Sequence, residues 1–215
     1  DVMPSDITGF SIYDQKTGSF RYQEGAVLCN LFLADEINRA GSRTQAALLE
    51  AMEEGAVTVD GVTRPIPQPF AVIATQNPTG AAGTQLLPDS QLDRFMLRFS
   101  LGYPSHDAEV ELLRRKNEGN IQRAQQVMDA AALQQAQKQV RQVFISPEVY
   151  DYIVRLVGAT RTYPGVRQGA SPRASRALFR AARAWAAMAG LPSPGASTGH
   201  SPYYVGSLVW CGIKN

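Results

Sequence analysis

The hydrophobic pattern of the first hundred residues predicts strands separated by turns and one helix. Nearly continuous apolar runs at residues 26–34 and 70–75 are typical of parallel strands covered on both faces. The alternation of Phe and Leu over residues 95–101 predicts a third strand. Between these runs, the apolar stripe of residues 42–54 predicts a helix that ends at Gly55.

Two hairpins are also expected in this part of the chain. The polar segment 14–18 predicts a turn between short strands at residues 10–13 and 19–22. Asp60-Gly61 is a strong signal for a two-residue turn, here within residues 56–67.

After Pro104 the pattern becomes helical. We expect a short helical turn at 88–94 and helices at 105–117, at about 129–143, from Ser146-Pro147 onward, and from Ser171-Pro172 to Gly190. Residues 191–215 are rich in Gly, Pro, Ser and Tyr without periodicity. The expected organisation is an α/β part at residues 1–104, an all-helical part at 105–190 and an atypical tail at 191–215.

Composition excludes several classes of protein. Hydrophobic residues make up 44% of the chain, and 21 basic residues against 19 acidic ones leave a net charge of +2. These values disfavour a disordered chain and a strong nucleic-acid binder. Two cysteines, Cys29 and Cys211, exclude a disulfide framework, and two histidines, His106 and His200, leave little material for a histidine metal site.

The chain shows no targeting or membrane segment. No apolar run approaches eighteen residues, so no transmembrane helix is expected. The first ten residues, DVMPSDITGF, lack a basic region, an apolar region and an initiator Met. We therefore expect a cytoplasmic protein, and a chain that begins inside a longer one.

The strongest chemical feature is the acidic pair Asp35-Glu36, directly after the first apolar run. Ligands of open α/β sheets bind at the carboxyl ends of strands. One acid there could hold Mg²⁺ through water, and its neighbour could orient an attacking water. Equally, the pair could cap the following helix and favour its positive end. The two interpretations stay open on this feature alone.

Three further residues could belong to the same site. Asn77 follows the second apolar run and could orient water, although Asn-Pro is also an ordinary turn. Arg94 could bind phosphate through paired donors, although an isolated arginine is more often a solvated surface residue. Arg173 opens a helix, where a cation is unfavourable to the helix dipole. That cost hints at an anionic partner, but a surface arginine is the simpler explanation.

Taken together, these features resemble the MoxR family of AAA+ ATPases. The resemblance extends from Asp1 to about Gly190 and is dense from Pro4 to Pro104. The segments that carry it are Leu33-Ala34-Asp35-Glu36-Ile37-Asn38-Arg39-Ala40, Gln45-Ala46-Ala47-Leu48-Leu49-Glu50-Ala51-Met52-Glu53-Glu54-Gly55, Ala74-Thr75-Gln76-Asn77-Pro78, Leu92-Asp93-Arg94-Phe95 and Gly169-Ala170-Ser171-Pro172-Arg173-Ala174.

The resemblance implies the fold and the cofactors. The fold would be an incomplete P-loop NTPase (AAA+) αβα core with a parallel sheet, followed by a small helical lid. The ligands would be ATP and Mg²⁺. Residues 9–25 resemble an insertion that this clade carries, and the hairpin at 56–67 resembles the insertion before sensor 1. Such hairpins line the ring's pore in related enzymes.

The resemblance also assigns a role to each site residue. Asp35 and Glu36 would be the Walker B pair, with Asp35 on Mg²⁺ and Glu36 activating the water. Asn77 would be sensor 1. Arg94 resembles the arginine finger, which acts on ATP bound by a neighbouring subunit, and Arg98 is a weaker candidate for it. Arg173 would be sensor 2, which reaches the phosphates from the lid.

The chain departs from the family pattern at two places. No G-x-x-x-x-G-K-[ST] loop is present, and residues 80–84 offer glycines but no lysine. Since that loop and two strands precede the first residue in the family, we expect an N-terminal truncation, a gap in the sheet and weak ATP binding by this chain. In the family, a short strand-like segment and an acidic turn into a last helix usually follow the lid helix. Residues 191–215 show neither and resemble a frame-shifted or mis-annotated end, with a genuine divergent tail as the alternative.

The expected function is that of an ATP-driven ring, a hexamer, that remodels or matures partner protein complexes. Family members often act with a protein that carries a von Willebrand A domain. One alternative is a nucleic-acid motor of the same superfamily, against which the near-neutral charge argues. Another is a non-catalytic ring subunit that contributes only Arg94, against which the complete set Asp35, Glu36 and Asn77 argues.

Overall fold

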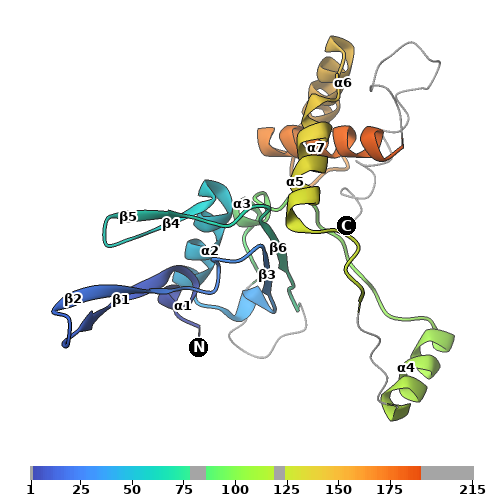
Figure 1. Cartoon of the computed structure of the whole chain (residues 1–215). Coiled ribbons are helices and arrows are strands. Elements are labelled where there is room, and N and C mark those ends of the chain that lie inside the picture. Colours follow the sequence, from blue (N-terminus) through green and yellow to red (C-terminus); the bar gives the residue numbers. More distant parts are fainter. Residues whose placement is uncertain (1, 78–85, 119–123, 190–215) are drawn as a thin grey trace. The chain divides into compact units, whose positions relative to one another are not determined.

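A computed structural model describes residues 2–77, 86–118 and 124–189 of the chain. The chain divides into two compact units, Asp1–Met96 and Leu97–Asn215 (Figure 1). The expected end of the last helix at Gly190, the tail 191–215 and the glycine-containing segment 80–84 lie outside the described residues. No helix in the described part of the chain is long and apolar enough to cross a membrane.

The first unit mixes short strands with helices, as the sequence predicts. Its elements in chain order are α1 (Pro4–Thr8), β1 (Gly9–Asp14), β2 (Ser19–Glu24), β3 (Leu31–Ala34), the 3-10 helix η1 (Ile37–Arg39), α2 (Ser42–Glu54), β4 (Ala56–Val59), β5 (Val62–Pro65), β6 (Ala71–Ala74) and α3 (Asp89–Leu92). The predicted helix at 42–54 is confirmed, and it ends at Gly55, whose φ of 65° is readily adopted by glycine.

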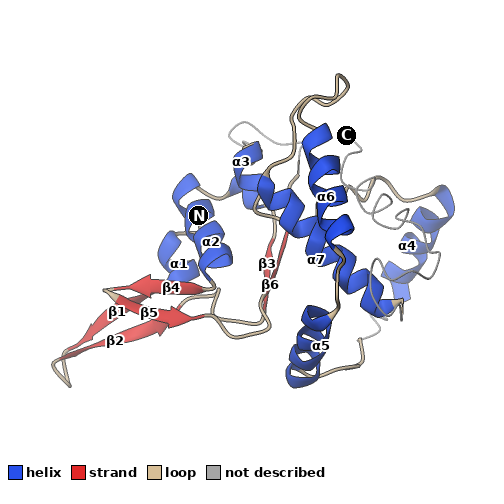
Figure 2. Ribbon diagram, turned by 90° about the horizontal axis from the view of Figure 1, so that it is seen from above, coloured by secondary structure: helices blue, strands red, loops and turns tan. Residues whose placement is uncertain are grey.

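Both predicted hairpins form. β1 pairs antiparallel with β2, and β4 pairs antiparallel with β5. Asp60 and Gly61 both have positive φ, 52° and 74°, as a two-residue turn of the primed type requires. The hairpins lie side by side (Figure 2), and the Arg64 guanidinium stacks 3.6 Å from the centre of the Tyr22 ring.

The core of this unit is built from apolar residues of several helices, strands and loops. Its buried members are Ile7, Val27, Ile37, Leu48, Ala51, Val57, Ile66 and Leu87. They come from α1, η1, α2, β4 and the loops between elements. Phe32 and Val72 pack against them from β3 and β6. The core therefore fixes the two parallel strands against α2, the helix that follows the acidic pair.

The two parallel strands are shorter than the apolar runs predict. β3 and β6 pair in the register Leu31↔Ala71 to Ala34↔Ala74. The expectation of one strand over 26–34 is wrong. The backbone N–H groups of Ala26 and Val27 donate to the carbonyls of Asp6 and Ile7 in α1, and not to a strand.

The prediction that both faces of these strands are buried is also wrong. Burial alternates along both strands, and Leu31, Leu33 and Ile73 are 62%, 63% and 54% exposed. The pleat directs alternate side chains to opposite faces of the strands. One face packs on the core through Phe32, Ala34, Val72 and Ala74, and the other face stays exposed in the described part of the chain.

The third predicted strand, at residues 95–101, does not form. These residues have turn or irregular backbone, and Leu97, Phe99 and Leu101 are 67%, 76% and 90% exposed. A strand exists only when another strand bonds its backbone, and no described strand lies beside this segment.

The second unit is helical, as predicted. Its helices are α4 (His106–Glu118), α5 (Ala130–Gln142), α6 (Pro147–Ala159) and α7 (Pro172–Met188). The last two begin with proline after the serines Ser146 and Ser171, as the sequence indicates. Ile153 and Val157 of α6 pack against Leu178 and Ala182 of α7 to form the core of this unit.

Candidate active site at the ends of two parallel strands

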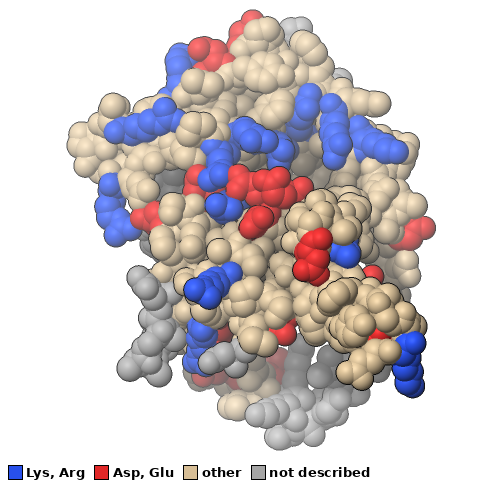
Figure 3. Space-filling model, turned by 90° about the vertical axis from the view of Figure 1, so that its left-hand side faces the viewer, with Lys and Arg blue, Asp and Glu red and all other residues tan. Residues whose placement is uncertain are grey.

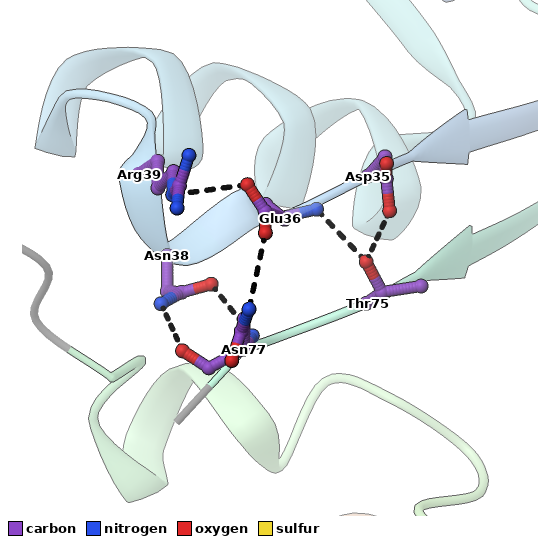
Figure 4. A network of polar contacts seen from close by, with 6 residues as sticks. All are labelled: Asp35, Glu36, Asn38, Arg39, Thr75 and Asn77. Carbon is purple, nitrogen blue, oxygen red and sulfur yellow. Dashed lines mark hydrogen bonds and ion pairs between the residues drawn. The ribbon is translucent and has the colours of Figure 1, made fainter. Parts of the chain in front are cut away.

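Asp35 and Thr75 lie side by side where β3 and β6 end. Ala34 and Ala74 are the last paired residues, so the next residue of each strand lies at the same edge. The Thr75 hydroxyl donates to Asp35 Oδ1 at 2.6 Å and accepts from the Glu36 backbone N–H at 2.8 Å (Figure 4). One hydroxyl thus fixes both the carboxylate of Asp35 and the backbone of Glu36.

Glu36 presents its carboxylate between an amide and a guanidinium. Its backbone is left-handed, with φ and ψ both 48°. Oε1 accepts from Asn77 Nδ2 at 3.3 Å, and Oε2 pairs with Arg39 Nε at 2.9 Å (Figure 4). The side chain stays 32% exposed. A carboxylate that is oriented by two partners and still reaches solvent can orient and deprotonate a water.

The acidic pair does not cap a helix. Glu36 occupies the position before η1, but its side chain makes no capping hydrogen bond there. The N-cap residue of α2 is Gly41. The carboxylates instead face Thr75, Asn77 and Arg39. This arrangement favours the functional interpretation of the pair over the capping one.

Two buried amides that the sequence analysis did not single out hold this loop. The Asn38 side chain is 3% exposed and exchanges two hydrogen bonds with the backbone of Asn77. Gln45 of α2 donates to the carbonyls of Ile37 and Ala40, both at 3.1 Å. A signal was present for Thr75, which follows one strand as Asp35 follows the other. Asn38 and Gln45 carried no such signal, because their partners are backbone groups.

The donor set at Asp35 suits a hard cation. Mg²⁺ prefers oxygen ligands and is commonly bound by one or two carboxylates, with water and phosphate oxygens completing the shell. Asp35, Glu36 and the Thr75 hydroxyl supply oxygen at this edge. No group of three or more His, Cys, Asp or Glu side chains that could hold a metal occurs within the described ranges. The site fits an ion shared with a ligand better than a dedicated protein cage.

Arg94, two residues after α3, contacts α2 in the half of that helix that lies toward its C-terminus. Its Nη1 pairs with Glu53 Oε2 at 2.8 Å and donates to the Leu49 carbonyl at 3.3 Å. Along α2, Leu49 lies about one turn and Glu53 about two turns beyond Gln45, which is about 6 Å and about 12 Å along a helix axis. Arg94 also lines a shallow cleft of about 400 Å³ with Gln91 and the acids Glu50, Glu53 and Glu54. The first unit therefore brings Asp35, Glu36 and Asn77 together and places Arg94 apart from them.

The other two predicted arginines belong to the second unit. Arg98 is exposed, in the irregular segment that follows the first unit. Arg173 is the second residue of α7, and its backbone N–H donates to the Ser171 side chain at 3.0 Å. Its side chain is exposed. Both keep their predicted roles as proposals.

Comparison with protein families finds two matches along the chain. The profile of the ATPase family associated with various cellular activities (AAA) matches residues 1–97. The profile of the AAA lid domain matches residues 158–192. The first match contains Asp35, Glu36, Asn77 and Arg94, and the second contains Arg173.

Individual proteins are similar over most of the chain. YeaC of Bacillus subtilis is 46% identical over 187 residues, which cover 86% of this chain and 58% of YeaC. The chaperone MoxR1 of Mycobacterium tuberculosis is 41% identical over 199 residues, which cover 88% of this chain and 52% of MoxR1. The chain thus spans little more than half the length of these curated relatives.

A solved structure supports the same relationship. The crystal structure of an ATPase candidate from Cytophaga hutchinsonii is 34% identical and superposes with a TM-score of 0.83, covering 99% of this chain and 66% of the other. The similarity in fold agrees with the two family matches and with the sequence similarity to a MoxR chaperone. The chain belongs to the MoxR family of AAA+ ATPases, of which it contains an α/β part and a helical lid.

Proposed function

We propose that the intact protein to which this chain belongs hydrolyses ATP to ADP and phosphate at the edge formed by β3 and β6. The observation that carries the proposal is the Glu36 carboxylate, held by the Asn77 amide beside Asp35. General-base and water-positioning groups must hold a fixed geometry at the attacked phosphoryl group. The network of Thr75, Asn38 and Arg39 supports such a fixed geometry.

Three residues of the first unit have separate roles in the proposed reaction. Glu36 takes the proton from the attacking water, and Asn77 orients that water and the terminal phosphate. Asp35 is the residue that would hold Mg²⁺ through water. When bound, Mg²⁺ offsets the negative charge of the phosphates.

Two arginines complete the proposed site from outside this edge. We assign Arg94 to ATP bound by a neighbouring subunit. Its partners Glu53 and Leu49 belong to α2 and hold the Arg94 side chain away from Glu36. We assign Arg173 to the phosphates from the lid. An arginine donates paired hydrogen bonds to phosphate oxygens and keeps its charge at every physiological pH.

The cycle is proposed to drive remodelling or maturation of partner protein complexes by a ring of subunits, a hexamer in the cytoplasm. The similarity to the chaperone MoxR1 supports a chaperone-like role. A client complex and a von Willebrand A domain protein are the partners we propose. Nucleic acid is disfavoured because acidic side chains lie among the basic ones on the face drawn in Figure 3, and because the net charge is only +2.

The Glu36→Gln substitution tests the proposal in the intact protein. Gln keeps the shape of the side chain and loses the base, so kcat should fall by about 10²-fold or more, while Mg-ATP still binds and accumulates unhydrolysed. Glu24→Gln, which changes an exposed glutamate of β2, is the matched control and should leave kcat unchanged. Unchanged turnover in Glu36→Gln would remove Glu36 from the reaction.

The chain itself offers a second readout. Its 215 residues contain no G-x-x-x-x-G-K-[ST] segment, whose backbone and lysine cradle the phosphates. We therefore expect this chain alone to bind Mg-ATP weakly or not at all. Tight binding measured by calorimetry would contradict that expectation.

A further inference from the structure

We propose that Asn38 is a positioning residue, which sets the distance between Glu36 and Asn77 by clamping the backbone of Asn77. The inference rests on the proposed function, because it names a residue that the hydrolysis reaction needs and that touches neither phosphate nor water. Asn38 acts through Asn77, and its role is therefore one of geometry and not of direct chemistry.

The clamp consists of two reciprocal hydrogen bonds. Asn38 Nδ2 donates to the Asn77 carbonyl at 3.1 Å, and the Asn77 backbone N–H donates to Asn38 Oδ1 at 3.2 Å (Figure 4). A side-chain amide thus pairs with a backbone as a strand would. Asn38 itself is only 3% exposed, and both bonds are partly buried. Partial burial makes them costlier to lose than hydrogen bonds on the open surface.

The clamp continues the strand pairing past the point where the strands end. The Thr75 N–H donates to the Ala34 carbonyl, and the Ile37 N–H donates to the Thr75 carbonyl, both at 3.0 Å. The next contact along the two segments is the Asn38–Asn77 pair. Without it, the backbone hydrogen bonds of Thr75 would remain, and the Asn77 backbone would lose its two hydrogen bonds to the loop that carries Glu36.

The contact that this clamp supports is weak by itself. Asn77 Nδ2 lies 3.3 Å from Glu36 Oε1, longer than the usual N–H···O distance. At this length the hydrogen bond holds Glu36 and Asn77 together more loosely than a short one would, so the position of the Asn77 backbone depends on other groups as well. Gln45 in turn holds the loop of Asn38 from α2, through the carbonyls of Ile37 and Ala40. The path of support therefore runs from α2 through η1 and Asn38 to Asn77.

The first experiment measures steady-state ATP hydrolysis and nucleotide stoichiometry in the intact protein with Asn38→Ala. Displacing a catalytic group by about 1 Å can cost about 10²-fold in rate, so kcat per bound nucleotide should fall about 10- to 100-fold, with KM for ATP within about threefold of wild type. Normalising to bound nucleotide removes any loss from unfolded protein. A kcat within about twofold of wild type overturns the inference.

Asn30→Ala is the matched control. Asn30 Nδ2 also joins the two segments, since it donates to the Pro69 carbonyl at 2.9 Å, but it does so at the opposite ends of β3 and β6. It should leave kcat unchanged. An equal loss of kcat in both variants overturns the inference, because it would show that any link between the segments matters and not the clamp at Asn77.

A second variant and a second measurement cover the case in which Asn38→Ala does not fold. Asn38→Ser keeps a hydroxyl for one of the two bonds, and the same kcat criterion applies to it. In the intact protein, Asn38→Ala should raise the hydrogen-exchange rate of the Asn77 amide about tenfold or more, since an opened hydrogen bond no longer protects it, and Asn38→Ser should raise it to a smaller extent. Unchanged exchange at Asn77 overturns the inference.

The outcomes separate this inference from the proposed function. If Glu36→Gln stops hydrolysis and the Asn38 variants do not slow it, the role of Asn38 is wrong and the proposed function stands. If Asn77 loses protection but neither Glu36→Gln nor Asn38→Ala changes turnover, the clamp exists and the proposed reaction is wrong, which also removes the positioning role.

Discussion

At the scale of the residue, the site depends on single polar groups with two partners each. Thr75 bonds both Asp35 and Glu36, Glu36 bonds both Asn77 and Arg39, and Asn38 bonds Asn77 twice. Each bond by itself contributes about 1 kcal/mol. Because each of these side chains makes two bonds, a single substitution removes two bonds at once.

Thr75→Val is the most direct test of this arrangement at the residue scale. Val keeps the shape of the side chain and removes the hydroxyl, so the carboxylate of Asp35 and the N–H of Glu36 each lose a partner. The free energy of unfolding of the first unit should fall by about 1–2 kcal/mol, as measured by amide hydrogen exchange. Thr75→Ser keeps the hydroxyl and should stay within about 0.5 kcal/mol of wild type. Equal stability of Thr75→Val and wild type would contradict the geometry.

The sequence was informative for some site residues and silent for others. Asp35 and Asn77 could be predicted because a polar residue directly after an apolar run marks the end of a strand. Thr75 holds the matching place on the neighbouring strand, but the sequence does not state the register that brings it to Asp35. Asn38 and Gln45 could not be found, because a buried amide that bonds backbone resembles any polar residue of a loop.

At the scale of the element, the helices followed their sequence signals closely and the strands did not. The N-terminal Ser-Pro pairs of α6 and α7 and the Gly55 end of α2 are local features, and local features decide where a helix begins and ends. A strand needs a partner, which periodicity does not supply. Residues 95–101 alternate as a strand should and still have no strand beside them.

Glu148 in the first turn of α6 gives a prediction about pH. The Ser146 hydroxyl and the backbone N–H of Glu148 donate to its carboxylate and lower its pKa from the ordinary 4.5. Because the folded pKa lies below the unfolded one, the stabilisation is complete above about pH 4.5 and is lost as the pH falls through the folded value. Wild type should therefore be more stable than Glu148→Gln at neutral pH.

The measurement is the free energy of unfolding of the two proteins across that range. The difference between them should shrink as the pH drops below 4.5 and vanish when both side chains are uncharged. A difference that stays constant with pH would mean that the carboxylate does not stabilise α6. Glu109→Gln, in the first turn of α4, provides a comparison at a second helix N-terminus.

At the scale of the whole molecule, the chain joins an α/β unit that holds the acidic pair to a helical unit that holds Arg173. Their combination could be predicted from the change in pattern near Pro104, because the period of the apolar positions changes there. The boundary itself is less distinct, since residues 95–101 read as part of the α/β region and form no strand in it. The proposed domain limits 1–104 and 105–190 remain proposals.

The uncovered face of β3 and β6 is a property of the whole sheet. Leu31, Leu33 and Ile73 expose apolar surface on neighbouring strands, and both outer strand edges lack a described partner. Exposed edges and apolar patches promote association. Any experiment on this chain by itself should therefore be run at low concentration, with its oligomeric state measured.

The central claim is that Glu36 and Asn77, forty-one residues apart in the sequence, act as one unit on the same phosphoryl group. A double-mutant cycle on kcat in the intact protein, with Glu36→Gln, Asn77→Ala and the double variant, tests it most directly. Groups that act as a unit are strongly non-additive, so the account predicts a double variant within about threefold of the slower single variant. Losses that multiply independently would show that the two residues serve separate purposes, and would contradict the account.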